Sequence, residues 1–201
     1  MTPETPSAIA PGRINPVLVL FMLLPLFGIV SALLLLTTTP APGSSDATPT
    51  PTLGIRPPEV LDRPAPALTL ASTSGDSVTL AQYAGRVVFV NFWWTGCPPC
   101  VQELPALQQF AAQQRTLPNG AVVLAVNTAE TTEQIRVFLE ANDIQLPDVP
   151  VLLDTDYSAQ RAYGVVLFPT TYIVNPNGVI TAVRYGAMKT EDFDAYLRAA
   201  L

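Results

Sequence analysis

The chain has 201 residues, of which 49% are hydrophobic, and a formal net charge of −6. This length allows one ordinary domain with additional segments, and the negative charge argues against nucleic acid as a partner. Histidine is absent, which excludes Ser-His-Asp triads, Cys-His proteases and histidine-ligated metal sites.

The N-terminal part contains one long apolar segment. Residues 17–36 carry no charged side chain, and a helix of that length, rising about 1.5 Å per residue, crosses a hydrocarbon core of about 30 Å. A cleaved signal peptide is the alternative, but its apolar region is shorter, at about 7–15 residues. We therefore expect a single transmembrane anchor in the lipid bilayer. Arg13 places residues 1–16 in the cytoplasm by the positive-inside bias, so the rest of the chain is expected to be extracytoplasmic.

A tether is expected between this anchor and a folded domain. Residues 37–61 are rich in Pro, Thr and Ser. Such a composition cannot bury enough apolar surface to fold, and its prolines make a semi-rigid linker. Residues 62–201 are then predicted to form the globular domain.

Strand and helix patterns alternate along residues 62–201. Strands are expected at 67–70, 78–80, 87–92, 121–127, 149–153, 170–174 and 179–184, and helices at 97–115, 131–142, 157–163 and 190–201. The continuous apolar run 87–92 is typical of a central strand buried on both faces, and Asn175-Pro176-Asn177-Gly178 predicts a hairpin turn. The predicted fold class is α/β, with a mixed β-sheet flanked by helices.

The only two cysteines lie in Cys97-Pro98-Pro99-Cys100, where the central strand gives way to a helix. Unpaired N–H groups and partial positive charge at a helix N-terminus favour a thiolate, and C-x-x-C pairs at such positions have depressed thiol pKa values. A purely structural disulfide is the alternative, although so small a ring gains only about 2 kcal/mol. The pair predicts thiol–disulfide exchange, with an exposed Cys97 as the attacking sulfur and a more buried Cys100 as the resolving one.

Two further residues are candidates for the site. Glu103 shares the helix face of Cys100 and can accept its proton; the alternative is a solvated first-turn glutamate favoured by the helix dipole. Pro169 precedes a predicted strand, where a trans proline is well tolerated and a cis bond is found in only about 5–6% of cases.

Several segments together resemble one family. The resemblance is to the thioredoxin superfamily, in its membrane-tethered TlpA/ResA branch, which includes extracytoplasmic thiol-disulfide oxidoreductases of cytochrome c maturation. It rests on Val90-Asn91-Phe92-Trp93, the two cysteines, Glu103 and Pro105, Pro64-Ala65-Pro66, and Phe168-Pro169-Thr170-Thr171 with Asn177-Gly178. The resemblance implies that Pro169 is cis and packs beside Cys97, and that the Phe168 backbone pairs with a substrate strand. It also implies that the Glu103 carboxylate has a role in the reaction, as the acceptor of the Cys100 proton.

Two positions near the cysteines qualify this resemblance. Asn91 lies where thioredoxin has a buried Asp, and because an amide cannot take up a proton at neutral pH, Glu103 is the better proton acceptor. Gly96 stands where the family has Trp directly before the first Cys, and Trp94 stands where a small residue is common. Either Trp94 covers the disulfide or the rim is more open. Trp94, Gly96, Pro98 and Phe168 are therefore the expected substrate-binding residues.

The predicted function is that of a membrane-anchored thiol-disulfide oxidoreductase. Its expected partners are exported disulfide-containing proteins, apocytochrome c among them, and a membrane electron donor that re-reduces it; no cofactor is expected. The alternatives on the same fold are a Cu(I)-binding or delivery module using both thiolates and a thiol peroxidase. Copper-chaperone relatives add a histidine, which is missing here, and peroxiredoxins have a threonine where this chain has Trp94.

Overall fold

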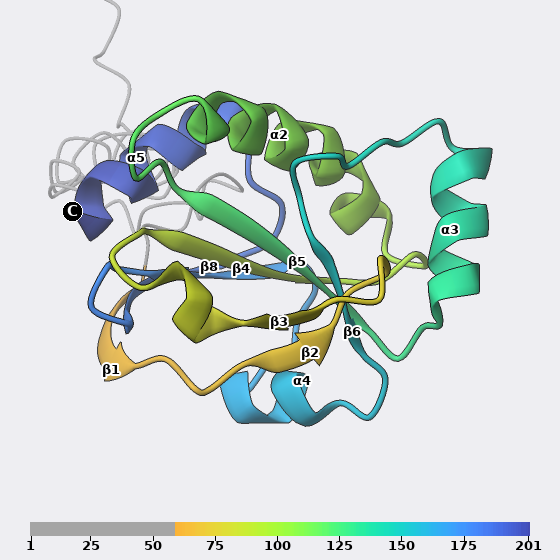
Figure 1. Ribbon diagram of the computed structural model, residues 1–201, viewed down its shortest axis with the longest axis horizontal. Helices are drawn as coiled ribbons and strands as arrows, with labels where there is room; N and C mark the ends of the chain where they lie inside the picture. Colours follow the sequence, from red (N-terminus) through yellow and green to blue (C-terminus); the bar gives the residue numbers. More distant parts are fainter. Residues whose placement is uncertain (1–58) are drawn as a thin grey trace, which may run out of the picture. The chain divides into compact units, whose positions relative to one another are not determined.

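The computed structural model describes residues 59–201 (Figure 1), and within them a six-stranded mixed sheet forms the centre. Its order is β1-β8-β7-β4-β5-β6. β4, β5 and β6 are parallel, whereas β7, β8 and β1 continue the sheet in antiparallel fashion from the other edge of β4. The strands are β1 (Glu59–Pro64), β4 (Val88–Trp93), β5 (Val122–Thr128), β6 (Val151–Asp154), β7 (Thr170–Val174) and β8 (Val179–Tyr185). The predicted mixed sheet is confirmed, with 88–93 at its centre.

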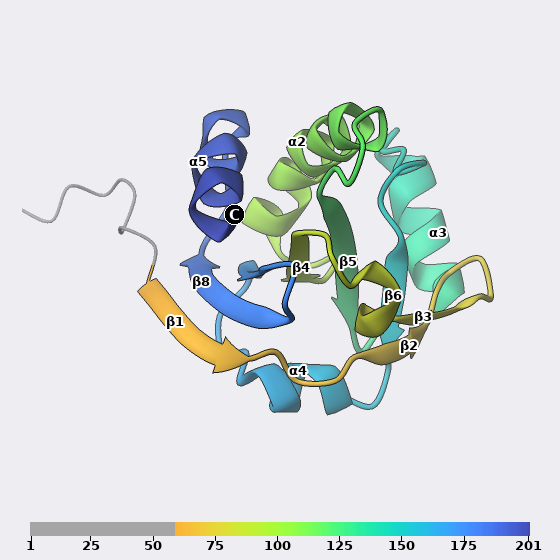
Figure 2. The same ribbon diagram turned by 60° about the vertical axis from the view of Figure 1, so that its left-hand side comes forward.

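Helices cover both faces of the sheet. α2 (Pro98–Arg115) and α5 (Thr190–Ala200) lie together on one face, and α4 (Ser158–Tyr163) lies on the other with the hairpin of β2 (Thr69–Ala71) and β3 (Ser77–Thr79) (Figures 1 and 2). α3 (Thr132–Ala141) packs Ile135 into the α2 side of the core. A short 3₁₀ helix, η1 (Leu80–Tyr83), follows β3. This is the α/β arrangement that the alternating sequence pattern predicts.

The alternation of side chains along β4 divides the core into two layers. Phe89 faces α2 and α5, where it contacts Phe110 with ring centroids 5.1 Å apart. Phe92 faces α4, where it packs on Tyr163 at 5.3 Å. Because successive strand residues point to opposite faces, Asn91 falls on the α2 side, and this places a polar side chain inside the layer that carries the cysteines.

Two helix ends carry residues that favour them. Thr131 caps α3, and its hydroxyl accepts a hydrogen bond from the Gln134 N–H, as expected of a threonine before a helix. Gly164 closes α4 with φ of 73°, a left-handed conformation that glycine adopts without a steric penalty.

The start of the domain differs from the prediction. β1 begins at Glu59, so residues 59–61, which the composition places in the linker, belong to a strand. β1 is an edge strand paired only with β8, and its sequence carries charges and no alternation. Its existence depends on the free edge of β8, which lies more than a hundred residues further along the chain.

The predicted N-terminal tail (1–16), anchor (17–36) and most of the linker (37–61) lie outside the described residues. Among the helices of 59–201, none combines the length and apolar character required to cross a bilayer. These N-terminal assignments therefore stay predictions.

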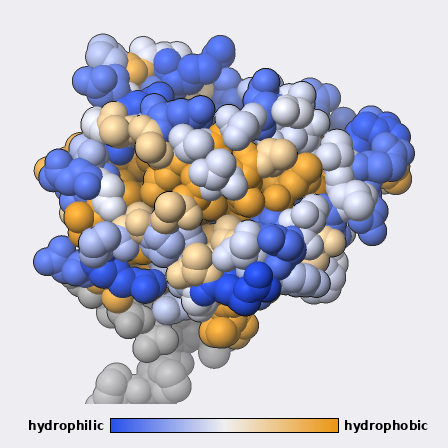
Figure 3. Space-filling view, turned by 60° about the horizontal axis from the view of Figure 1, so that its bottom comes forward, coloured by the Kyte–Doolittle hydropathy of each residue, from blue (hydrophilic) through white to orange (hydrophobic). Residues whose placement is uncertain are grey.

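The sheet face that carries the β2–β3 hairpin is covered incompletely. A cavity of about 460 Å³ lies there, and its apolar lining includes Leu68, Leu80, Val88 and Val174. Figure 3 shows hydrophobic residues gathered in a band across one face of the molecule, between hydrophilic borders.

Candidate functional site

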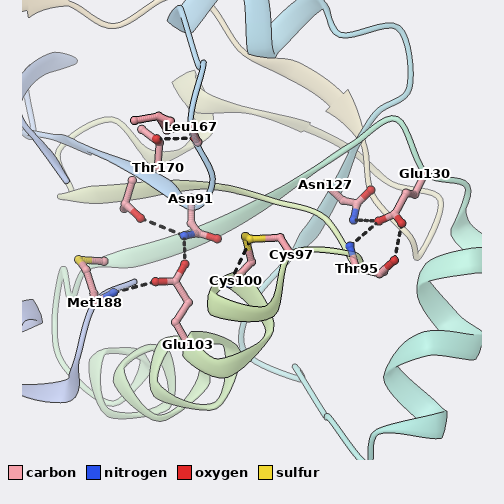
Figure 4. Close-up of a disulfide and its surroundings, with 11 residues drawn as sticks. Asn91, Thr95, Cys97, Cys100, Glu103, Asn127, Glu130, Leu167, Thr170 and Met188 are labelled. Atoms are coloured by element: carbon pink, nitrogen blue, oxygen red, sulfur yellow. Dashed lines mark hydrogen bonds between the residues drawn. A yellow bond between two sulfur atoms is a disulfide. The ribbon is translucent and has the colours of Figure 1, made fainter. Parts of the chain in front are cut away.

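The two cysteines lie where β4 gives way to α2, and they form a disulfide (Figure 4). Cys97 is the N-cap of α2, with extended backbone, and its Sγ accepts a hydrogen bond from the Cys100 N–H at 3.3 Å. A donor in this position stabilises a thiolate when the pair is reduced, because it places partial positive charge on the sulfur that must ionise.

The prolines between the cysteines limit the donors at this helix end. Pro98 and Pro99 occupy the first two helical positions and have no N–H. The Val101 N–H is engaged by the Cys97 carbonyl. The Cys100 N–H is thus the first helical donor that can face the Cys97 sulfur. Pro98 is exposed beside it, and its contact with a substrate stays a prediction.

The exposure of Cys97 is lower than predicted. Its relative exposure is 6%, and that of Cys100 is 0%, so the expectation of an exposed Cys97 is wrong, although it remains the more accessible of the two. Cys97 belongs to the buried cluster on the α2 side of the sheet, against which Phe168 packs. The Trp94 ring lies beside Gly96, and 42% of the Trp94 surface is exposed.

Glu103 is buried, with only 2% of its surface exposed. Its carboxylate accepts hydrogen bonds from the Asn91 side-chain amide and, at 2.8 Å, from the Met188 N–H (Figure 4). The Asn91 amide also donates to the Thr171 hydroxyl at 2.9 Å. The alternative of a solvated first-turn glutamate is therefore wrong, because the fold encloses this side chain between α2, β4 and the segment before α5.

Burial determines the protonation of Glu103. Loss of solvation raises its pKa from 4.5 to about 7, against the opposing effects of the Met188 and Asn91 hydrogen bonds and the positive charge of Arg184. A carboxyl group with a pKa near neutrality can both accept and release a proton at physiological pH. This is the behaviour needed of a group that takes a proton from a neighbouring thiol.

The raised pKa of Glu103 predicts a stability that falls with pH. Between pH 4.5 and about 7 the native state keeps a proton that the unfolded state has released, so the free energy of unfolding decreases as pH rises through this window. The decrease amounts to about 3 kcal/mol. Glu103→Gln, which is neutral at every pH, should remove this slope in denaturant titrations of the oxidised protein between pH 4.5 and 8. Glu191→Gln, at an exposed glutamate of α5, is the control, and an equal slope in all three proteins would contradict the prediction.

The predicted proline lies at the same edge of the sheet. The Phe168–Pro169 peptide bond is cis, as the family resemblance implies. β7 begins at Thr170, which pairs with Phe92 near the end of β4, so Pro169 comes next to the strand end that leads to Cys97. Pro169 itself is buried, and Phe168 is half-buried against both core layers.

A second carboxylate, Glu130, holds the loop before Cys97 and was not among the predicted site residues. It accepts hydrogen bonds from the backbone N–H of Thr95 at 2.9 Å, from the Thr95 hydroxyl and from the Asn127 amide at 2.7 Å (Figure 4). The one sequence signal for Glu130 is its position just after the strand that became β5. Because β5 runs parallel to β4, both strands end at the same edge of the sheet, and residues that follow them lie near Cys97. Glu130 therefore fixes the backbone that presents Trp94, Gly96 and Cys97.

This fold and site define a thioredoxin-like oxidoreductase: a central strand leads into a helix capped by a redox-active disulfide, with a cis-proline beside it. Within residues 59–201 no group of three or more His, Cys, Asp or Glu side chains is placed to hold a metal ion. A Redoxin family model matches residues 61–199. The chain belongs to this family and is a ResA-like member of the thioredoxin superfamily.

Individual relatives agree with this assignment. The chain is 33% identical over 137 residues to the thiol-disulfide oxidoreductase ResA of Bacillus subtilis strain 168, covering 66% of this chain and 72% of ResA. It is 35% identical over 136 residues to the thioredoxin-like protein YneN of the same organism, covering 66% and 76%. Among solved structures, a putative thiol:disulfide interchange protein DsbE from Chlorobium tepidum matches with a TM-score of 0.62 and 28% identity, covering 69% of this chain and 96% of that one. The chain is thus a thiol-disulfide oxidoreductase.

Proposed function

We propose that this thiol-disulfide oxidoreductase is anchored in the cell membrane by residues 17–36, faces the extracytoplasmic side, and reduces disulfides of exported proteins. The observation that carries the reaction is the Cys97–Cys100 disulfide, with the Cys100 N–H on the Cys97 sulfur and the buried Glu103 on the same helix. The anchor and its orientation are supported by the uncharged segment 17–36 and by Arg13. The role in maturation of apocytochrome c, and re-reduction by a membrane electron donor, are supported by the resemblance to the ResA branch.

The proposed reaction has two exchange steps. In the reduced protein the Cys97 thiolate attacks a sulfur of the partner disulfide; a Cys97–partner bond forms, the partner bond breaks, and the other partner sulfur leaves as a thiolate. Cys100 then loses its proton and attacks the Cys97 sulfur. The Cys97–Cys100 bond forms, the partner leaves with its second thiolate, and the partner has gained two electrons. A donor dithiol returns those electrons to the pair.

Glu103 is the proposed acceptor of the Cys100 proton. Both residues lie on one face of α2, three positions apart, and the Glu103 pKa of about 7 leaves part of the population ionised at neutral pH. Buried carboxylates of this kind are suited to proton transfer with a thiol, because neither group is strongly favoured as the ion.

The Glu103→Gln variant tests this role. We expect its second step, release of the partner from Cys97, to be slower by about 10- to 100-fold, and the pH dependence near 7 to be lost. The measurement is single-turnover release of a fluorescent peptide from a preformed mixed disulfide between pH 5.5 and 8.5, with Glu191→Gln as control. An unchanged rate and profile would leave Glu103 with a structural role only.

The membrane anchor predicts that the full chain stays with the membrane. After expression with its native N-terminus, the intact chain should remain in the membrane fraction through an alkaline carbonate wash, and its folded domain should be degraded by protease added outside the cytoplasmic membrane. The mass of the purified chain distinguishes the anchor from a signal peptide. A chain that lacks about the first thirty residues would show that the segment is a cleaved signal peptide, which would contradict the predicted anchor but not the export of the domain.

A further inference from the structure

A pocket lies next to the loop that precedes Cys97, with Trp94 and Phe168 in its lining, and the reaction described above does not use it. It has a volume of about 360 Å³. Trp94, Tyr157 and Phe168 supply three aromatic rings to its lining, with Glu130 among the remaining residues. Trp94 comes from the loop before Cys97, Glu130 from the loop between β5 and α3, Tyr157 from the start of α4, and Phe168 from the cis-proline loop. We call it the rim pocket.

The Trp94 wall of the rim pocket depends on the glycine at position 96. A Cβ at position 96 would lie 2.1 Å from the Trp94 ring and 2.6 Å from the next ring atom, so any residue other than glycine displaces the indole. Gly96 and Trp94 are thus interdependent: glycine directly before Cys97 provides the space in which the indole can form one wall.

Large apolar side chains are unusually exposed around this pocket. Trp94 is 42% exposed and Tyr157 46%, and Val166 and Leu167, directly before Phe168, are 80% and 57% exposed. Of the seven large hydrophobic residues exposed in 59–201, these four surround the cis-proline loop and the pocket. Clustered exposure of this kind marks a surface that a partner covers.

The backbone is strained at the same place. Tyr157 has φ of 62° and Ala129, which also lines the pocket, has φ of 67°. The left-handed region is unfavourable for a side chain as bulky as tyrosine, and residues held there cluster at ligand-binding sites. The fold thus keeps the Tyr157 ring at the pocket in a conformation that a free chain would avoid.

We propose that the rim pocket binds one aromatic side chain of the partner protein, within two residues of the partner cysteine that Cys97 attacks. This inference rests on the proposed exchange reaction. Phe168 lines the pocket and packs against the cluster that contains Cys97, and Trp94 lies three residues before Cys97. A partner chain joined to Cys97 by a disulfide would therefore have the pocket within reach of its neighbouring side chains. Three aromatic rings favour an aromatic occupant through edge-to-face and offset contacts. The Glu130 carboxylate disfavours an acidic side chain.

The test uses the reduced full chain and disulfide-linked peptides that differ only in the residue next to the attacked cysteine: Phe, Ala or Glu. We expect kcat/KM for the Phe peptide to exceed that for the Ala peptide by about tenfold, with the Glu peptide lowest. Each protein's rate with bis(2-hydroxyethyl) disulfide, which is too small to fill the pocket, serves as its own reference.

Three variants separate the pocket from general effects. Trp94→Ala should reduce the Phe-to-Ala ratio to about twofold or less. Gly96→Ala should do the same while keeping the indole, because it displaces Trp94. Leu117→Ala, at an exposed leucine after the far end of α2, should keep the wild-type ratio. Equal rates for the Phe and Ala peptides in the wild type, or a ratio that survives both Trp94→Ala and Gly96→Ala, would overturn the proposal. Failure to reduce bis(2-hydroxyethyl) disulfide would instead refute the exchange reaction itself.

Discussion

Replacing Cys97 by serine should lower the rate of disulfide reduction to that of the uncatalysed reaction. A serine hydroxyl does not ionise near neutral pH and cannot form a sulfur–sulfur bond, so the first exchange step is lost entirely. Cys100 cannot substitute for it, because its exposure is 0% and it lies one turn inside α2. The measurement is the reduction of insulin disulfides by the full chain, with dithiothreitol as the electron source.

A matched control distinguishes loss of the thiol from loss of the fold. Ser is close in size to Cys, and Cys97 caps α2 through its side chain, a position where serine is also favoured. The Cys97→Ser protein should therefore keep its helix content and unfold cooperatively. Full reducing activity in this folded variant would show that Cys97 is not the attacking sulfur.

Replacing Cys100 by serine should convert the enzyme into a covalent trap. Cys97 still attacks a partner disulfide, but no second thiol is present to break the mixed disulfide, so catalytic turnover is lost while one equivalent of partner is retained. The expected readout is a set of high-mass species on non-reducing gels of a cell-envelope extract. Dithiothreitol should release these species, and mass spectrometry of the released chains identifies the partners.

The double variant Cys97→Ser with Cys100→Ser provides the control for this capture. It has no thiol, so it should retain nothing from the same extract. If Cys100→Ser captures no more than this control, the proposed order of the two cysteines is wrong. If the captured chains include apocytochrome c, the proposed place in cytochrome maturation gains direct support.

Residue patterns read along the chain were sufficient for most of the sheet. The apolar run 87–92 and the turn 175–178 predicted the central strand and the terminal hairpin, because each depends on neighbouring residues. β1 was not predicted at Glu59, since an edge strand of irregular pattern is stabilised by its pairing partner and not by its own sequence. Within the site, too, some features depend on neighbouring residues and others on distant partners.

Local sequence determined the identity of the reacting group: two cysteines three positions apart at a helix start, with prolines between them. Only the tertiary structure decided how that group is surrounded. In the folded chain Glu103 is buried and hydrogen-bonded to Asn91 and Met188, and Cys97 is less exposed than its place at the helix start predicts. Glu130 is hydrogen-bonded to Thr95, which lies 35 residues away along the chain. The physical reason is that covalent spacing fixes which atoms are neighbours within a helical turn, whereas desolvation and long-range hydrogen bonds exist only after separate elements have packed together.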